Sequence, residues 1–261
     1  MERKYVEIDK VIEYIKQHIY EPISLTELAR YAAYSPYHFI RIFKERMGVP
    51  PQYYVSTLRL QHAKDLLIHT NLSVRDISLE VGQSSLGTFT TRFTERVGMT
   101  PSEFRNSPVM SEHFLHSLHQ FNNWEVSINK RSQYAKLEGN IKAEIPFAGI
   151  VLVGLFPKPI PEGLPLYGTL LRQLGDFCFT DVKPGSYFLM ATSVSWGSQT
   201  VDFILPHSTL RTRTKDPIII ESGKPVPFQK VMLYTPLLDD PPILISLPLL
   251  MERFLNRITY K

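Results

Sequence analysis

Three histidines at a three-residue spacing are the first candidates for metal chemistry in this 261-residue chain. His113, His116 and His119 could share one face of a helix, and imidazole nitrogens on one face can bind zinc. The same segment, however, has an apolar helical face, carboxylates are scarce apart from Glu112, and no cysteine lies nearby. We therefore expect a linker helix with solvent-facing histidines, and neither a metal nor another cofactor.

Motifs for bond-making chemistry are missing from the sequence. It has no Gly-rich phosphate loop, no Gly-x-Ser-x-Gly elbow and no paired metal-ligand motif. The single cysteine, Cys178, excludes an internal disulfide and a cysteine-rich zinc site, and it suggests a reducing compartment. We expect a protein that is not an enzyme and that acts by binding.

One pattern of helix signals occurs twice between residues 24 and 101. Residues 24–29 correspond to residues 73–78, and residues 35–51 correspond to residues 84–101. The offset is 49 residues in the first part of the pattern and 50 in the second. A repeat of this length indicates two copies of one structural unit.

Capping signals predict where the helices of each copy begin and end. Ser24 with Glu27 has the spacing of a capping box, and Ser35 precedes a proline at the first helical position. Gly48 and Gly98 are suited to end helices in the left-handed conformation. Each copy is thus predicted to be a short helix, a tight turn and a second helix, and a long helix over residues 51–69 joins the copies.

Residues 5–106 resemble the DNA-binding domain of AraC-type (AraC/XylS) transcriptional regulators. The matching residues are Tyr54-Val55, Arg59-Leu60, Ala63, Leu66-Leu67, Thr70, Ile77, Gly82, Phe89, Phe93, Gly98-Met99-Thr100-Pro101 and Phe104-Arg105. The resemblance implies a bacterial transcription factor with two helix-turn-helix units joined by one helix. Gln83 departs from the usual aromatic, and Thr91 from the usual arginine, with Arg92 one place later. Both departures affect what the second unit reads.

In a helix-turn-helix, the N-terminal part of the second helix points at base edges. For the first unit this predicts base contacts from Tyr37, Ile40 and Arg41. Arg41 can make a bidentate contact to guanine, and its alternative is a solvated or phosphate-bound side chain. Three further residues are expected at phosphates, which fix register without specifying sequence: His38, Lys44 and Arg46.

The second unit is expected to present a small, weakly polar face to DNA. Its residues are Ser85, Leu86, Gly87, Thr88, Thr90, Thr91 and Arg92. Apolar groups here suit thymine methyls, and only Arg92 could fork onto guanine. We therefore predict strong discrimination at the first half-site and softer, A·T-leaning discrimination at the second.

The joining helix sets the spacing of the two units. Nineteen residues span about 28 Å, which approaches one turn of duplex at about 34 Å. One chain could thus fill two major-groove half-sites of double-stranded DNA, and both a monomer and a homodimer remain open. We expect Arg59 of this helix to form an ion pair with Asp76.

Strand patterns dominate the second half of the chain. We predict an all-α domain over residues 1–107, a partly helical linker over 108–140, and a mainly β domain over 141–261 that ends in a helix. Short strands and turns favour a sandwich-like arrangement. Pro184-Gly185 indicates a hairpin turn, the run at 201–205 reads as a strand, and Ser246 is suited to cap the last helix.

A loop with four prolines between residues 154 and 169 favours a ligand site, because such loops often carry function. The candidate lining residues are Tyr167, Trp196, His207 and Arg211. One hypothesis makes residues 141–261 an effector-binding domain for a small molecule. The alternative is a protein-interaction or dimerisation module without a ligand, with RNA polymerase as a candidate partner.

Composition and charge set only broad limits. With 43% hydrophobic and 21% charged residues, the chain has the composition of a soluble globular protein. The sequence lacks a secretory signal and a membrane-spanning run, so we expect a cytoplasmic protein without a membrane partner. The net charge of +4 divides equally between residues 1–107 and the remainder. Charge alone therefore does not indicate nucleic acid.

Overall fold

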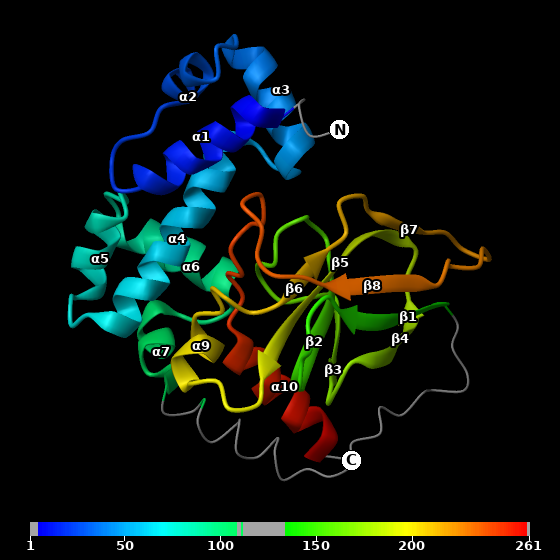
Figure 1. Ribbon diagram of the computed structural model, residues 1–261. Coiled ribbons are helices and arrows are strands. Elements are labelled where there is room, and N and C mark those ends of the chain that lie inside the picture. The colour runs from blue at the N-terminus through cyan, green and yellow to red at the C-terminus, as the bar shows by residue number, and fades with distance from the viewer. Residues whose placement is uncertain (1–4, 109–110, 112–133, 260–261) are drawn as a thin grey trace. The chain divides into compact units, whose positions relative to one another are not determined.

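The computed structural model of the protein describes residues 5–108, 111 and 134–259. They cluster into two compact units, and Figure 1 shows their elements. The N-terminal unit combines Met1–Arg105 with Leu237–Leu244, and the C-terminal unit combines Asn106–Pro236 with Ile245–Lys261. His113, His116 and His119 lie outside the described residues.

The N-terminal unit is helical, as the repeat predicts. Its helices are α1 (Val6–Gln17), α2 (Leu25–Tyr31), α3 (Pro36–Met47), α4 (Pro51–His69), α5 (Val74–Glu80), α6 (Leu86–Val97) and α7 (Pro101–Arg105). The joining helix has the bounds predicted from its prolines. Figure 1 shows α4 running between the α1–α3 group and the α5–α7 group.

Local hydrogen bonds account for the helix boundaries. The Glu27 amide donates to Ser24 Oγ at 3.1 Å, and the Ser24 amide donates to the Glu27 carboxylate at 2.9 Å. This reciprocal cap lowers the pKa of Glu27 because the backbone amide stabilises the ionised carboxylate. At the other ends, Gly48 and Gly98 have φ values of 80° and 93°, which other residues adopt only with strain.

The core of each copy is built in the same way. Phe43 packs 5.7 Å from Tyr54 at the start of α4, and Phe93 packs 5.8 Å from Phe104 in α7, measured between ring centroids. All four side chains are fully buried. Burial of this kind supplies the main favourable term for folding the helical unit.

The expected ion pair between Arg59 and Asp76 was wrong. Arg59 donates instead to the backbone carbonyls of Ile19 and Glu21, at 3.4 and 2.8 Å. These carbonyls follow α1, where the backbone lacks helical partners. A Cβ at Gly82 would come within 3.0 Å of the Arg59 guanidinium, so the glycine also leaves room for this contact.

The C-terminal unit contains sheets of three and five strands. The strands are β1 (Ala135–Ala143), β2 (Gly149–Phe156), β3 (Tyr167–Leu171), β4 (Gly175–Val182), β5 (Gly185–Ser195), β6 (Arg211–Arg213), β7 (Ile218–Ile220) and β8 (Gln229–Leu233). The first sheet has the order β4-β1-β8, with β8 parallel to β1. The second has the order β3-β2-β5-β6, and β7 also pairs with β5.

Two local expectations for this unit were wrong. β4 and β5 flank the Pro184 turn but belong to different sheets, so this connection joins the sheets and is not a hairpin. The run expected as a strand at 201–205 is largely helix α9 (Thr200–Ile204). A reciprocal cap between Gln199 and Asp202 favours the helix, and a short apolar run cannot itself distinguish the two. β1 also begins six residues before the expected boundary at 141.

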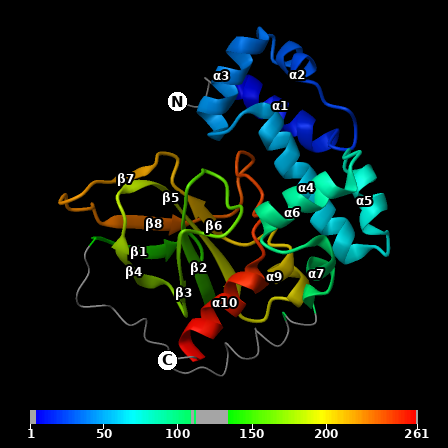
Figure 2. The same ribbon diagram turned by 180° about the vertical axis from the view of Figure 1, so that it is seen from behind.

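Both sheets contribute to one hydrophobic cluster. Leu137 and Phe179 from the first sheet are buried in the same cluster as Val153 and Leu189 from the second. Helix α10 (Leu247–Thr259) begins after Ser246, whose hydroxyl accepts the Leu249 amide at 3.3 Å. Figure 2 shows α10 beside the sheet seen from behind. The sandwich-like arrangement stays a prediction. Within the described ranges, no helix has the length and apolarity needed to cross a membrane.

Candidate nucleic-acid interface

Helix α3 presents a polar face because its apolar residues point inward. The His38 amide donates to Ser35 Oγ at 3.4 Å, which fixes the start of the helix. Phe39 is fully buried, whereas Tyr37 remains 82% exposed. Arg41 and Lys44 are also exposed, and Ile40 is half-buried beside them. The structure therefore brings the predicted base-contact residues of the first unit onto one face.

Two residues predicted at phosphates have contacts within the protein. The His38 ring lies 4.7 Å from the Tyr34 ring and is half-buried. Arg46 donates to Asp9 Oδ1 at 3.1 Å and pairs with Asp239 Oδ2 at 3.0 Å. Because both carboxylates belong to the same unit, the guanidinium of Arg46 already has anionic partners. We leave Arg46 out of the proposed interface.

Helix α6 presents the corresponding face of the second unit. Ser85 Oγ accepts the Thr88 amide at 3.3 Å and caps the helix. Leu86 is 43% exposed, and a Cβ at Gly87 would meet only the Ser85 hydroxyl, at 4.0 Å. The surface above Gly87 is thus open to a close approach. The other predicted residues on this helix are exposed or half-buried: Thr88, Thr90, Thr91 and Arg92.

A contact that was not predicted joins Gln83, one of the two departures from the family pattern, to Arg92, which follows the other. Arg92 Nη1 donates to Gln83 Oε1 at 3.2 Å. The backbone of Gln83 is also held, because its N–H donates to the Ser78 carbonyl at 2.8 Å. The guanidinium that could reach guanine is therefore oriented by Gln83, three residues before the start of α6. The nine-residue separation of these two side chains gives no periodic signal in the sequence.

The predicted ligand residues are not gathered in one place. Tyr167 pairs with Leu155 near the end of β2, whereas Trp196 follows the residue that pairs with Gly149 at its start. Six residues of strand separate these ends by about 20 Å. Tyr167 instead accepts the Lys183 amide at 3.1 Å on its hydroxyl.

Arg211 has a structural position. It is buried, and its guanidinium donates to the carbonyls of Pro206, Thr209 and His207. These contacts hold the loop between α9 and β6, and His207 is exposed on that loop. A role for Tyr167, Trp196, His207 and Arg211 as one lining set finds no geometric support here.

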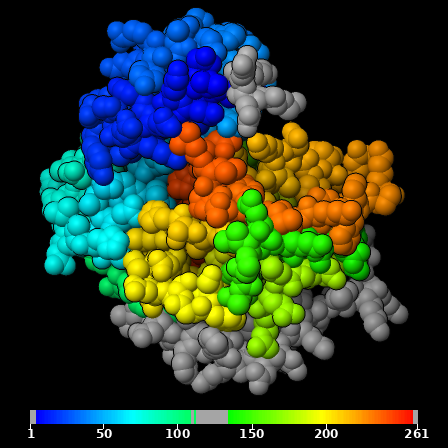
Figure 3. Space-filling model, viewed as in Figure 1, coloured from blue at the N-terminus to red at the C-terminus, as the bar shows by residue number. Residues whose placement is uncertain are grey.

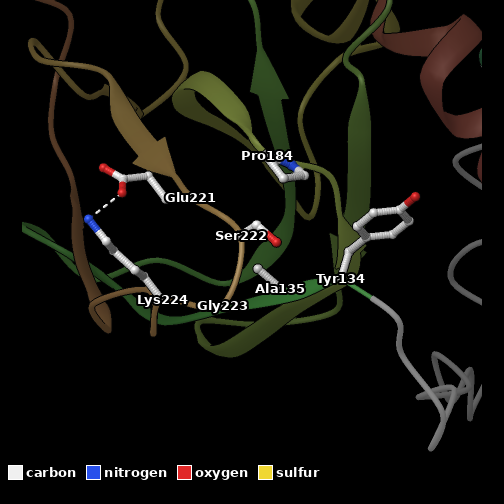
Figure 4. A pocket seen from close by; sticks show the side chains of 7 residues that line it. All are labelled: Tyr134, Ala135, Pro184, Glu221, Ser222, Gly223 and Lys224. Atoms are coloured by element: carbon white, nitrogen blue, oxygen red, sulfur yellow. Dashed lines mark ion pairs between the residues drawn. The ribbon is translucent and has the colours of Figure 1, made fainter.

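A small cavity in the C-terminal unit is lined by other residues. Its volume is about 190 Å³, and Figure 4 shows the side chains around it. The lining residues are Tyr134, Ala135, Pro184, Glu221, Ser222, Gly223 and Lys224. Glu221 and Lys224 form an ion pair beside the cavity (Figure 4). Among the described residues, His, Cys, Asp and Glu side chains form no cluster arranged to hold a metal.

Comparison with known proteins identifies the N-terminal region. Residues 28–107 match the family model described as a helix-turn-helix domain. An uncharacterized HTH-type transcriptional regulator of Staphylococcus aureus strain MSSA476 is 32% identical over 120 residues, which are 46% of this chain. The match covers 16% of that protein, so this chain spans a small part of its length.

Two further proteins are similar to part of this chain. The bifunctional transcriptional activator/DNA repair enzyme AdaA of Bacillus subtilis strain 168 is 36% identical over 105 residues, 40% of this chain and 50% of AdaA. The crystal structure of a transcriptional regulator with an AraC-type DNA-binding domain from Chromobacterium violaceum is 31% identical. It covers 39% of this chain and 90% of its own, with a TM-score of 0.38.

The repeated helices and the family match identify residues 28–107 as a helix-turn-helix domain. Apart from Asn106 and Ser107, the C-terminal unit lies beyond the residues that the family model matches.

Proposed function

We propose that this protein is a sequence-specific DNA-binding transcriptional regulator that reads two major-groove half-sites with α3 and α6. One observation carries the proposal: two capped helices of the same length expose a face at the same position of each repeat. The exposed Arg41 on α3 suits guanine, and the Leu86 and threonine methyl groups on α6 suit thymine. The nineteen residues of α4 match the spacing of successive grooves to within about 6 Å.

The test is selection of bound duplexes from a random DNA pool at a fixed salt concentration, because non-specific binding depends steeply on salt. We expect two enriched blocks about one helical turn apart. The Arg41→Ala variant should lose the preference of one block by about tenfold or more. Arg253→Ala removes an exposed arginine from α10 and is the matched control.

Two results would count against this proposal. Pools that show no enriched motif with the full chain would oppose sequence-specific reading. Equal loss of both blocks in Arg41→Ala would oppose the assignment of α3 to one half-site.

We further propose that the C-terminal unit controls this activity, with a small-molecule effector as the first hypothesis and a protein-interaction or dimerisation module as the alternative. The separate hydrophobic core of this unit supports an independent role. A ligand that raises the melting temperature would favour sensing. A stoichiometric partner, RNA polymerase included, or a concentration-dependent dimer would favour the alternative.

A further inference from the structure

An eight-residue segment distant in sequence is packed into the N-terminal unit. Leu237–Leu244, which we call the docking segment, follows β8 and precedes α10, yet it clusters with Met1–Arg105. Figure 3 shows its orange-red atoms against the blue atoms of the N-terminal helices. The chain therefore passes between the two units three times.

Two lysines donate to backbone carbonyls of the docking segment. Lys16 Nζ on α1 binds the Leu238 carbonyl at 3.0 Å, and Lys64 Nζ on α4 binds the Ile243 carbonyl at 2.9 Å. Lys64 is fully buried, and its ammonium lies 5.4 Å from the centre of the Phe104 ring. Because a buried ammonium must be hydrogen-bonded to be tolerated, the docking segment supplies part of what makes this helix core stable.

An ion pair adds a third attachment from a third helix. Arg46 on α3 pairs with Asp239 at 3.0 Å, and Asp239 is only 5% exposed. The same guanidinium also binds Asp9 of α1, so the docking segment joins a network that connects α1 with α3. Removing one member of such a buried network leaves another charge without its partner.

Contacts within the docking segment restrict its conformation. The Leu237 amide donates to Asp240 Oδ2 at 2.9 Å, and the Asp240 amide donates back to the Leu237 carbonyl at 3.1 Å. Pro241 and Pro242 follow and restrict the backbone to a narrow range of φ. A turn followed by two prolines loses less conformational entropy on docking than a flexible segment would.

We propose that α1, α3 and α4 form a binding site for the docking segment, and that its occupancy couples the C-terminal unit to the first helix-turn-helix. Only residues 234–236 separate β8 from the segment, and only residues 245–246 separate the segment from α10, so a change in either element acts on it. Arg46 lies on α3, the helix proposed to read the first half-site. The docking does not depend on which sequence, if any, that helix binds.

Hydrogen exchange of the full chain without DNA tests this proposal. Asp239→Asn keeps the side-chain size but removes the charge that pairs with Arg46. We expect amide exchange in the docking segment, α1 and α3 to rise about tenfold. Asp216→Asn makes the same chemical change at an exposed position in the C-terminal unit and should leave these rates unchanged.

A second variant keeps the test decisive. Lys64→Met keeps a similar side-chain length but replaces the ammonium with an apolar group that cannot donate to Ile243. Amide exchange in the docking segment should therefore rise in this variant too. The effects of Asp239→Asn and Lys64→Met should be non-additive, since both act on one docked segment. Unchanged exchange in the docking segment in both variants would overturn the proposal. So would an equal increase in β2 and β5, which would indicate a general loss of stability.

Discussion

The two helix-turn-helix copies share a backbone plan but differ in what surrounds their last helical turn. Arg46 and Arg96 occupy equivalent places, each two residues before the glycine that ends α3 or α6. Arg46 binds two carboxylates, Asp9 and Asp239, whereas Arg96 donates to the hydroxyls of Ser56 and Thr57. The same local signals thus give the same helices, while the partners of equivalent residues come from elsewhere in the chain.

Each arginine also lies over a tyrosine ring, which underlines the shared plan. The Arg46 guanidinium is 5.4 Å from the centre of the Tyr5 ring, and that of Arg96 is 4.4 Å from Tyr53. The two arginines thus have partners of different kinds. Arg46 pairs with carboxylates, one of which belongs to the docking segment, whereas Arg96 donates to hydroxyls of α4.

The largest expected difference follows from these partners. Arg46→Gln should lower the free energy of unfolding of the N-terminal unit by about 2 kcal/mol, because it leaves the mostly buried carboxylates of Asp9 and Asp239 without their cation. Arg96→Gln should cost about 1 kcal/mol, because it removes neutral hydrogen bonds and a cation–π contact. Urea unfolding followed by helical circular dichroism measures both, with Arg253→Gln as the control. Equal costs, or a larger cost for Arg96→Gln, would contradict the electrostatic distinction.

Most of the helical unit could be predicted because its signals are local. Ser24, Pro36 and Gly48 specify the boundaries of α2 and α3 through bonds and backbone angles within one turn. The predicted ends of α4 also agree with the structure. The contacts of Arg46 with Asp239 and of Arg59 with Glu21 could not be predicted. They join residues distant in sequence, and an arginine or a carboxylate gives no periodic signal of its partner.

The C-terminal unit was harder to predict for the same reason. A turn sequence such as Pro184-Gly185 indicates that the chain reverses, but strand pairing decides whether the flanking strands share a sheet. The three hydrogen bonds that Arg211 donates to backbone carbonyls depend on the fold of a whole loop. The exposed faces of α3 and α6 could be predicted, since they follow from helix periodicity alone.

A smaller difference should appear in DNA binding by the exposed faces of α3 and α6. Arg92→Ala should weaken binding to the second half-site by about tenfold, since among the residues proposed to contact DNA from α6 it removes the one that can fork onto guanine. Gln83→Ala should weaken the same half-site about two- to threefold, because Arg92 remains but loses the hydrogen bond that orients it. Binding to duplexes with either half-site scrambled measures both effects. Gln173→Ala changes an exposed glutamine in the C-terminal unit and is the control.

The double variant sharpens this prediction. If Gln83 acts through Arg92, Gln83→Ala should have no further effect in the Arg92→Ala background. Full additivity would show instead that Gln83 acts independently of Arg92. If these variants lose affinity only for the first half-site, the assignment of α6 to the second half-site is wrong.

The smallest expected difference is a pH dependence that His62 gives to the joining helix α4 and that α1 lacks at the equivalent position. His62 on α4 corresponds, at the 49-residue offset, to the exposed Glu13 on α1. Burial lowers the pKa of His62, and the charges of Asp65 and Glu80 only partly oppose this effect. Its ring also packs edge-on against Tyr20, at 4.6 Å between centroids.

The direction of this pH dependence follows from which state of the chain, folded or unfolded, protonates His62 at the higher pH. The unfolded chain protonates His62 near the ordinary value of about 6.5, whereas the folded chain does so only at lower pH. Stability should therefore fall as pH decreases below about 6.5, by less than about 1 kcal/mol because the ring is partly exposed. His62→Gln should remove this part of the pH dependence of urea unfolding, and His69→Gln, at an exposed position of the same helix, should retain it. If the two variants instead follow the same pH profile, the neutral ring of His62 does not distinguish α4 from α1.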